Sequence, residues 1–196
     1  TVSVSDPWEP VNRAIFRFND GVYTILLRPI SKVYETVLPK PIRKGLDNVF
    51  ENVRVPVRLV NDVLQGKFER ATRELEKFVL NSTWGIGGIL RLSDRIPSLA
   101  EVPAADTGQT FAKWGIQRGP YIVLPLLGPS TLRETVGYAG DSALNPVSWV
   151  TTAFGAPVWA IAFPSTNTLR SLPHQLRIYD AATENTLDPY VAARSA

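Results

Sequence analysis

The feature that most constrains the fold is a run of 28 residues without a charged side chain, between Asp141 and Arg170. Its central part, 143–165, is apolar enough to suggest a membrane, but prolines and a glycine interrupt it. A helix that crosses a bilayer needs about 20 continuous apolar residues. The two apolar pieces, 147–154 and 158–163, are far shorter. The run therefore predicts a hairpin of two short helices.

Two environments can bury such a hairpin: the core of a soluble protein, or one leaflet of a membrane. Each large apolar side chain gains about 1.5–3 kcal/mol on leaving water in either case, so this energy does not decide between them. Composition favours a soluble core, whereas two tryptophans in the hairpin favour a membrane interface. The candidate membrane-embedding residues are Val147, Trp149, Val150, Phe154, Val158, Trp159, Ile161 and Phe163.

Most of the remaining chain carries apolar residues at helical spacing, three or four residues apart. The expected helices cover 11–27, 42–54, a shorter piece from Pro56 to Leu64, 68–78 and 169–187. Asp6 is a candidate cap of the first helix, and Thr131 and Glu134 have the spacing of a capping box at another helix start. The sequence thus predicts an all-α protein, in which Pro164 ends the second arm of the apolar hairpin.

Composition argues against several classes of function. The chain holds 21 Lys and Arg against 18 Asp and Glu, and the two signs are mixed along it, so a nucleic-acid partner is not expected. It has no cysteine and a single histidine, His174, so a metal site would depend on carboxylates almost alone. We therefore expect no metal, no cofactor and no nucleic acid.

Catalytic motifs are also missing from the sequence. There is no nucleophile elbow, and the glycine-rich segment WGIGG, 84–88, lacks the lysine and the Ser or Thr of a phosphate-binding loop. Carboxylate pairs suited to acid–base chemistry do not stand out. The sequence predicts a protein that is not an enzyme.

Four blocks, in order along the chain, resemble the MlaA family, also called VacJ lipoproteins. They are DPWEPVNRAIFRFND (6–20), FVLNSTWGIGG (78–88), DTGQTFAKWGIQRGPYIVLPLLGPSTLRE (106–134) and LDPYVAARS (187–195). The similarity covers nearly the whole sequence, and four ordered blocks are far more specific than any single motif.

The resemblance implies one MlaA-like domain over residues 1–196, built as a ring of amphipathic helices around a central amphipathic channel. The ring would lie in the inner leaflet of the outer membrane on its periplasmic side, anchored by a lipid-bearing cysteine that we expect to precede Thr1. Family members remove mislocalised phospholipid from the outer leaflet, pass it to the periplasmic carrier MlaC, and associate with trimeric porins. Two alternatives stay open: a lipid-modifying enzyme, and a structural scaffold bound to a porin.

The resemblance also suggests roles for individual residues. The apolar hairpin would lie within one leaflet. Arg13, Arg17 and Arg133 are candidates to line the lipid channel, because the guanidinium fork suits a phosphate, although an ion pair at a helix surface is the commoner role for each. Asn12 and Asn19 are expected to hydrogen-bond neighbouring loops, and the glycines to permit close packing. The motif residues with an expected structural role are Asn12, Asn19, Asn81, Gly85, Gly88, Gln109, Trp114 and Gly128.

Overall fold

The computed structural model describes residues 5–100, 102–153, 157–184 and 186–195, with the backbone alone over 150–153 and 157–165.

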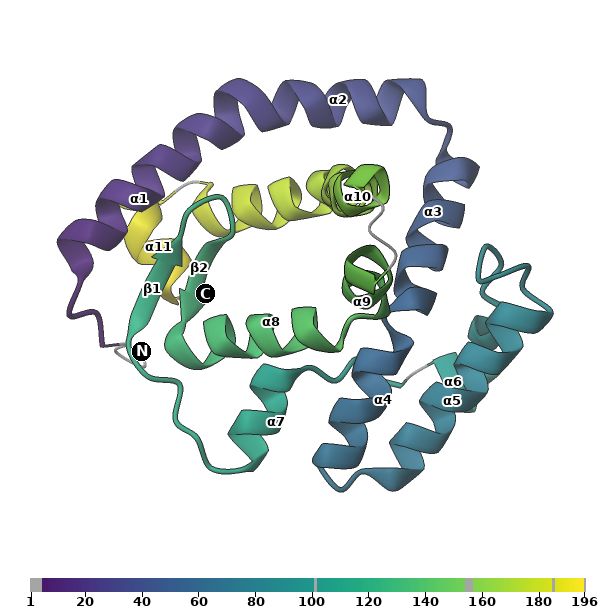
Figure 1. Cartoon of the computed structure of the whole chain (residues 1–196). Coiled ribbons are helices and arrows are strands. Elements are labelled where there is room, and N and C mark those ends of the chain that lie inside the picture. Colours follow the sequence, from purple (N-terminus) through teal and green to yellow (C-terminus); the bar gives the residue numbers. More distant parts are fainter. Residues whose placement is uncertain (1–4, 101, 154–156, 185, 196) are drawn as a thin grey trace.

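The N-terminal part of the chain forms a curved arm (Figure 1). In the arm, α1 (Glu9–Val22), the π-helix η1 (Tyr23–Leu27) and α2 (Arg28–Val37) follow one another without a break (Figure 1). Pro29 lies in the first turn of α2, where a helix tolerates proline. The helical arm therefore continues to Val37, ten residues beyond the predicted end at Leu27.

Asp6 does not cap α1, contrary to the prediction. The residue at the cap position is Trp8, which makes no capping hydrogen bond through its side chain. The Asp6 carboxylate instead accepts hydrogen bonds from Asn12, at 2.8 Å, from the Tyr190 hydroxyl and from Arg194. Asp6 therefore joins the two ends of the chain.

The middle of the chain folds into helices close to those predicted. They are α3 (Lys40–Val53), α4 (Val55–Leu64), α5 (Phe68–Thr83), the 3-10 helix η2 (Leu92–Arg95), α6 (Pro97–Ala100) and α7 (Thr107–Lys113). Pro56 lies at the start of α4, where it separates α4 from α3. Gly66, with a φ of 72°, follows the end of α4, as a glycine after a helix commonly does.

A short β-hairpin stands where the sequence argued only against a long helix. Strands β1 (Tyr121–Leu124) and β2 (Gly128–Thr131) pair antiparallel, with Tyr121 opposite Thr131. Thr131 then caps α8 (Leu132–Leu144): its hydroxyl accepts a hydrogen bond from the Glu134 backbone nitrogen at 3.3 Å. The predicted cap is confirmed.

The apolar hairpin is formed by α9 (Pro146–Ala153) and the first turns of α10 (Pro157–Thr183), which contact each other. The prediction that Pro164 ends this second arm, and that another helix begins near Leu169, is wrong: α10 is one helix of 27 residues. An interior proline costs a helix about 3 kcal/mol or more. The contacts of α10 with α2, α3 and α11 (Pro189–Ser195) offset this cost.

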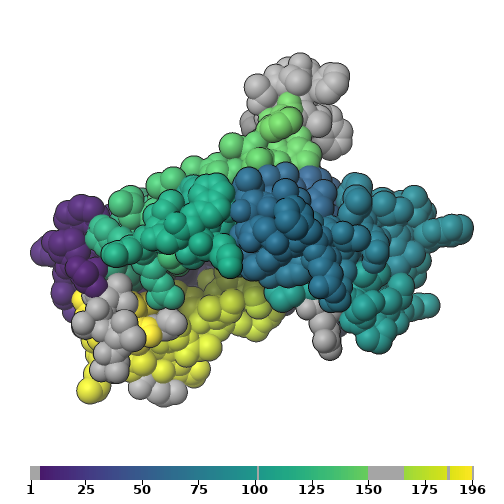
Figure 2. Space-filling view, turned by 90° about the horizontal axis from the view of Figure 1, so that it is seen from below, coloured from purple at the N-terminus to yellow at the C-terminus, as the bar shows by residue number. Residues whose placement is uncertain are grey.

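Together these elements close a ring (Figure 1). The arm, α3, α4, α8 and the β-hairpin follow its circumference, and α10 crosses its interior. In the view turned by 90°, the start of α9 rises from one face, while the end of α10 and α11 lie at the opposite face (Figure 2). The predicted helical ring is confirmed. Within the described ranges, no helix has both the length and the apolar character to cross a membrane.

Burial in this ring runs against the usual pattern. Asn12, Asn61, Asp62 and Glu74 are at most 2% exposed, whereas large apolar side chains lie at the surface. The most exposed of these on the helices and their connections include Ile25, Val37, Phe68 and Trp84, between 66% and 80% exposed. Buried polar groups stabilise contacts between elements only where they find hydrogen-bond partners. The large number of exposed apolar side chains fits a protein whose surface contacts apolar surroundings.

Candidate functional site

A cavity of about 640 Å³ lies inside the ring, and we call it the central cavity. Residues from α1, η1, α3, α4, the hairpin turn, α8 and α10 border it. Its apolar lining is formed by Val22, Leu26, Leu27, Phe50, Val53, Val57, Pro125, Leu126, Leu127 and Leu172. Its polar lining is formed by Arg54, Tyr138, Asp141, Ser142, Asn145, Asn167, Thr168, Arg170, Ser171 and Gln175.

The two kinds of lining come from different elements. The arm and the hairpin turn supply apolar side chains, and α3 adds two more, whereas α8 and α10 supply most of the polar ones. The cavity therefore has one apolar and one polar side. Such a space fits a molecule that itself has an apolar and a polar part.

The arm positions the apolar side through polar contacts with the hairpin turn. The Asn19 side chain donates to the Leu124 carbonyl at 2.9 Å and accepts from the Leu126 nitrogen at 2.8 Å, and the Tyr23 hydroxyl donates to the Leu126 carbonyl at 3.0 Å. Leu126 has a φ of 65°, which is unusual for a residue with a side chain. A strained backbone conformation persists where neighbouring groups stabilise it. Here the hydrogen bonds of Asn19 and Tyr23 stabilise the Leu126 backbone at the cavity wall.

Asn12 makes the matching contact nearer the start of β1. Its side chain donates to the Tyr121 carbonyl at 3.0 Å and accepts from the Val123 nitrogen at 2.9 Å. Asn12 and Asn19 thus act as backbone-like partners for the β-hairpin.

On the polar side, Arg170 is already neutralised. Its side chain is 9% exposed, lies 3.2 Å from Asp47 and 3.6 Å from Glu51, and stacks over the ring of Phe50 at 4.8 Å. Burial raises the pKa of the Glu51 carboxyl, but neighbouring arginines, Arg58 foremost, lower it below its ordinary value. Glu51 therefore favours its ionised form, and the ion pairs of Arg170 join α3 to α10.

Arg54 differs from Arg170. Its side chain is exposed at the cavity wall, and within the described part of the chain no carboxylate lies at ion-pair distance from it. Asp141, the acidic residue of the lining, already accepts hydrogen bonds from the Thr107 nitrogen at 2.9 Å and hydroxyl at 2.6 Å. Arg54 is the lining cation available to an anion. Sequence reasoning missed it, because nothing in the local pattern distinguishes Arg54 from other helix-end arginines.

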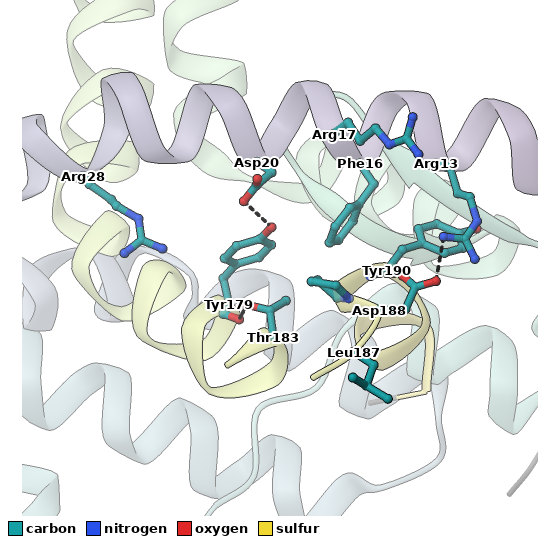
Figure 3. A pocket seen from close by; sticks show the side chains of 11 residues that line it. Arg13, Phe16, Arg17, Asp20, Arg28, Tyr179, Thr183, Leu187, Asp188 and Tyr190 are labelled. Atoms are coloured by element: carbon teal, nitrogen blue, oxygen red, sulfur yellow. Dashed lines mark hydrogen bonds and ion pairs between the residues drawn. The ribbon is translucent and has the colours of Figure 1, made fainter. Parts of the chain in front are cut away.

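A second hollow, of about 470 Å³, lies between α1 and the α10–α11 connection (Figure 3). We call it the cationic pocket, because Arg13, Arg17 and Arg28 line it. Arg13 pairs with Glu9 at 2.7 Å and with Asp188 at 2.8 Å. These ion pairs fasten α1 to the C-terminal end of the chain.

The remaining arginines of the cationic pocket differ in their pairing. Arg28 lies 2.5 Å from Asp180, whereas Arg17 has no ion-pair partner among the described residues. Arg133 borders neither hollow and donates to the Ile116 carbonyl at 3.1 Å. Arg13, Arg17 and Arg133 therefore do not line the central cavity, and their part in lipid passage stays a prediction.

The asparagine and the glycines of the second block build one tight turn. The Asn81 side chain donates to the Ser93 hydroxyl at 3.0 Å and accepts from its nitrogen at 3.1 Å. A β-carbon on Gly85 would lie 2.2 Å from the Leu90 carbonyl oxygen, and one on Gly88 would lie 2.7 Å from Asn52. Both glycines permit close packing.

The motif residues of the third block also have structural contacts. Gln109 donates from its side chain to Asp106 at 2.8 Å, at the start of α7. The Trp114 indole donates to the Leu64 carbonyl at 3.1 Å, and Gly128 has a φ of 85° where β2 begins.

The apolar hairpin is described in part. Trp149 is 64% exposed, and its indole donates to the Ala143 carbonyl, while Val147 is half-buried. The side chains of the other membrane-embedding candidates lie outside the described residues: Val150, Phe154, Val158, Trp159, Ile161 and Phe163. Among the residues that are described, no cluster of His, Cys, Asp or Glu has a geometry that would hold a metal ion.

These features define a class of protein: a helical ring, closed by a β-hairpin, around an amphipathic cavity. The profile of the MlaA lipoprotein family matches residues 4–196, and the chain belongs to this family.

Comparisons with relatives and with a solved structure agree. An uncharacterised protein of Rickettsia typhi is 32% identical over 100% of this chain and 76% of its own length. The intermembrane phospholipid transport system lipoprotein MlaA of Escherichia coli K12 is 30% identical over 98% of this chain and 75% of its own length. A structure solved to explain the maintenance of bacterial outer-membrane lipid asymmetry superposes with a TM-score of 0.79, at 30% identity, over 97% of this chain and 94% of that one.

Proposed function

We propose that this protein maintains outer-membrane lipid asymmetry by moving phospholipid through the central cavity. The observation that carries the proposal is the division of the cavity lining into an apolar and a polar side. A phospholipid has the same division. The Escherichia coli relative belongs to an intermembrane phospholipid transport system, which supports the same substrate.

In this mechanism Arg54 binds the phosphate of the headgroup. Its guanidinium offers several N–H donors, and among the described residues no carboxylate lies at ion-pair distance from it, although its charge acts on the nearby Glu51 carboxyl. An acyl chain lies against the apolar side, formed by residues such as Leu26 and Leu27 of η1. The protein binds and orients the lipid and changes no bond in it.

The location that fits this function is the outer membrane, as for the family. The ring lies on the periplasmic side of the outer membrane, within the inner leaflet, where the exposed apolar side chains of the arm contact acyl chains. A trimeric porin holds the ring in place, and a periplasmic carrier of the MlaC type receives the lipid. Lipid leaves the outer leaflet and moves toward the periplasm.

The test is a transfer assay with a blocked cavity. The protein is placed in vesicles with phospholipid labelled in its headgroup, and label is counted on a separable acceptor. Ser142→Trp places an indole in the cavity lining, whereas Ser98→Trp alters an exposed serine of α6 away from it. We expect Ser142→Trp to abolish transfer and Ser98→Trp to leave it unchanged. Equal transfer by both variants would contradict passage through the cavity.

The same assay separates the two alternatives. Chromatography of the recovered label identifies an enzyme if the lipid has been chemically altered, and transport if it is intact. Porin binding by a protein that transfers no lipid identifies a scaffold.

A further inference from the structure

A third hollow, of about 340 Å³, opens beside the central cavity, between the β-hairpin, α10 and α11. We call it the side groove. Leu127, Leu172 and Gln175 line both the side groove and the central cavity. The two spaces are therefore neighbours, separated only by these three side chains.

The side groove is apolar along its length. Leu172 and Leu176 are 2% and 8% exposed and form its floor, and Ala182 and Ala193 form the far end. No charged side chain is among the described residues that line it. The hydroxyl group of Tyr179 is already bound, to Asp20 at 2.8 Å, so the groove offers little to a polar ligand.

The length of the side groove matches one hydrocarbon chain. Its α10 wall runs from Leu172 to Ala182, which are ten positions apart and therefore separated by about 15 Å at a rise of 1.5 Å per residue. The hydrocarbon core of a bilayer is about 30 Å thick, so one leaflet, and hence one acyl chain, spans about 15 Å. The groove therefore accommodates a chain along the helix axis.

We propose that the side groove is an acyl-chain subsite, which binds one chain of the phospholipid whose headgroup lies in the central cavity. This inference rests on the proposed function. It means that the protein recognises its lipid by chain as well as by headgroup: long-chain lipids fill the groove, and short-chain lipids do not reach its far end.

The experiment fills the far end of the groove. Ala182→Trp places an indole in it, and Ala181→Trp places the same indole on the neighbouring exposed position, which does not line the groove. Binding is measured, for the full chain in detergent micelles, with dipalmitoyl and dihexanoyl phosphatidylglycerol labelled in the headgroup. Circular dichroism checks the fold, and Ala193→Trp, from α11, is a second filling variant.

We expect the unsubstituted protein to bind the dipalmitoyl lipid more tightly than the dihexanoyl lipid. Each methylene withdrawn from water changes affinity about fourfold, so Ala182→Trp should weaken dipalmitoyl binding by about tenfold or more. Its dihexanoyl binding should change by less than about twofold, and Ala181→Trp should behave as the unsubstituted protein does.

The outcomes separate the two proposals. If Ala182→Trp and Ala193→Trp keep the preference for the long chain, the subsite is overturned and the transport function stands. If the unsubstituted protein binds neither lipid, the transport function and the subsite both fail. Should Ala182→Trp lose its helical signal, the result with Ala193→Trp decides.

Discussion

The central cavity and the cationic pocket both contain arginines, but they use them differently. In the cationic pocket Arg13 and Arg28 end on carboxylates that belong to the C-terminal part of the chain, Asp188 and Asp180. At the central cavity Arg54 has no such partner among the described residues. Arg13 and Arg28 therefore join two elements, as Arg170 does at the central cavity, whereas Arg54 is available to bind a ligand in the amphipathic cavity that it lines.

The same distinction extends to the side chains around each hollow. Next to the cationic pocket, Asn12 and Asp6 are bound on several sides and hold the arm, the β-hairpin and the C-terminus together. Around the central cavity, the lining is divided between apolar and polar groups. Substitutions beside the cationic pocket should therefore alter stability, and substitutions in the central cavity should alter lipid binding.

The largest expected effect is that of Asn12→Leu on stability. This change leaves the buried Tyr121 carbonyl and Val123 nitrogen without their partner. A buried polar group without a hydrogen bond costs about 1–3 kcal/mol, so we expect the free energy of unfolding to fall by about 3 kcal/mol in a urea titration. Val11→Leu, at the neighbouring exposed position, should change it by less than about 0.5 kcal/mol. A small effect of Asn12→Leu on the free energy of unfolding would contradict the structural role assigned to the residues beside the cationic pocket.

The second effect concerns lipid binding. We expect Arg54→Glu to weaken binding of dipalmitoyl phosphatidylglycerol by about tenfold or more, because hydrogen bonds to a charged group contribute about 1.5–3 kcal/mol. Arg17→Glu makes the same charge reversal in the cationic pocket and serves as the matched control, with an expected change below about twofold. The reverse order would move the headgroup site to the cationic pocket and restore the original prediction for Arg17.

A smaller effect is expected at the hairpin turn. Leu126→Gly relieves the positive φ, which costs a residue with a side chain about 1–2 kcal/mol, but glycine loses more chain entropy on folding. The net gain in the free energy of unfolding should be at most about 1 kcal/mol. Leu127→Gly, at the next exposed position of the turn and without a positive φ, should give no gain. Denaturant titration of both variants measures the difference.

The smallest effect is a dependence of stability on pH. Burial raises the pKa of Asp6, but hydrogen bonds from Tyr190, Asn12 and Arg194 outweigh burial, and the pKa in the folded protein lies below its ordinary value. This contribution to stability is present above the unfolded-state pKa of about 3.9 and disappears as the pH falls through the folded-state pKa.

We therefore expect the melting temperature to decline as the pH is lowered through and below about 4. Asp6→Asn should remove the part of the decline that Asp6 causes. The measurement is a melting curve at each pH for both proteins. Identical slopes would show that Asp6 does not join the chain ends in the way its hydrogen bonds indicate.

Much of the fold could be predicted from local pattern. Apolar spacing located α3, α4 and α5, and the Thr131 cap located the start of α8. Local pattern gave wrong helix ends and caps where contacts between residues far apart in the sequence determine the structure. Pro164 should end a helix by its own chemistry, yet α10 continues through it because α2, α3 and α11 pack along that helix. Asp6 has the chemistry of a cap, yet its carboxylate serves Tyr190 and Arg194, far away in the sequence.

The sequence by itself determined the helical content, the turn-forming glycines and the family, because these depend on residues close together along the chain. Only the tertiary structure decided that Arg54 has no ion-pair partner among the described residues, that the lining of the cavity divides into two sides, and that an apolar groove adjoins it. The physical reason is that the pairing of an arginine and the enclosure of a cavity depend on residues that are neighbours in space but not in the sequence. Only the folded chain brings Asp188 to Arg13 while leaving Arg54 at the cavity wall.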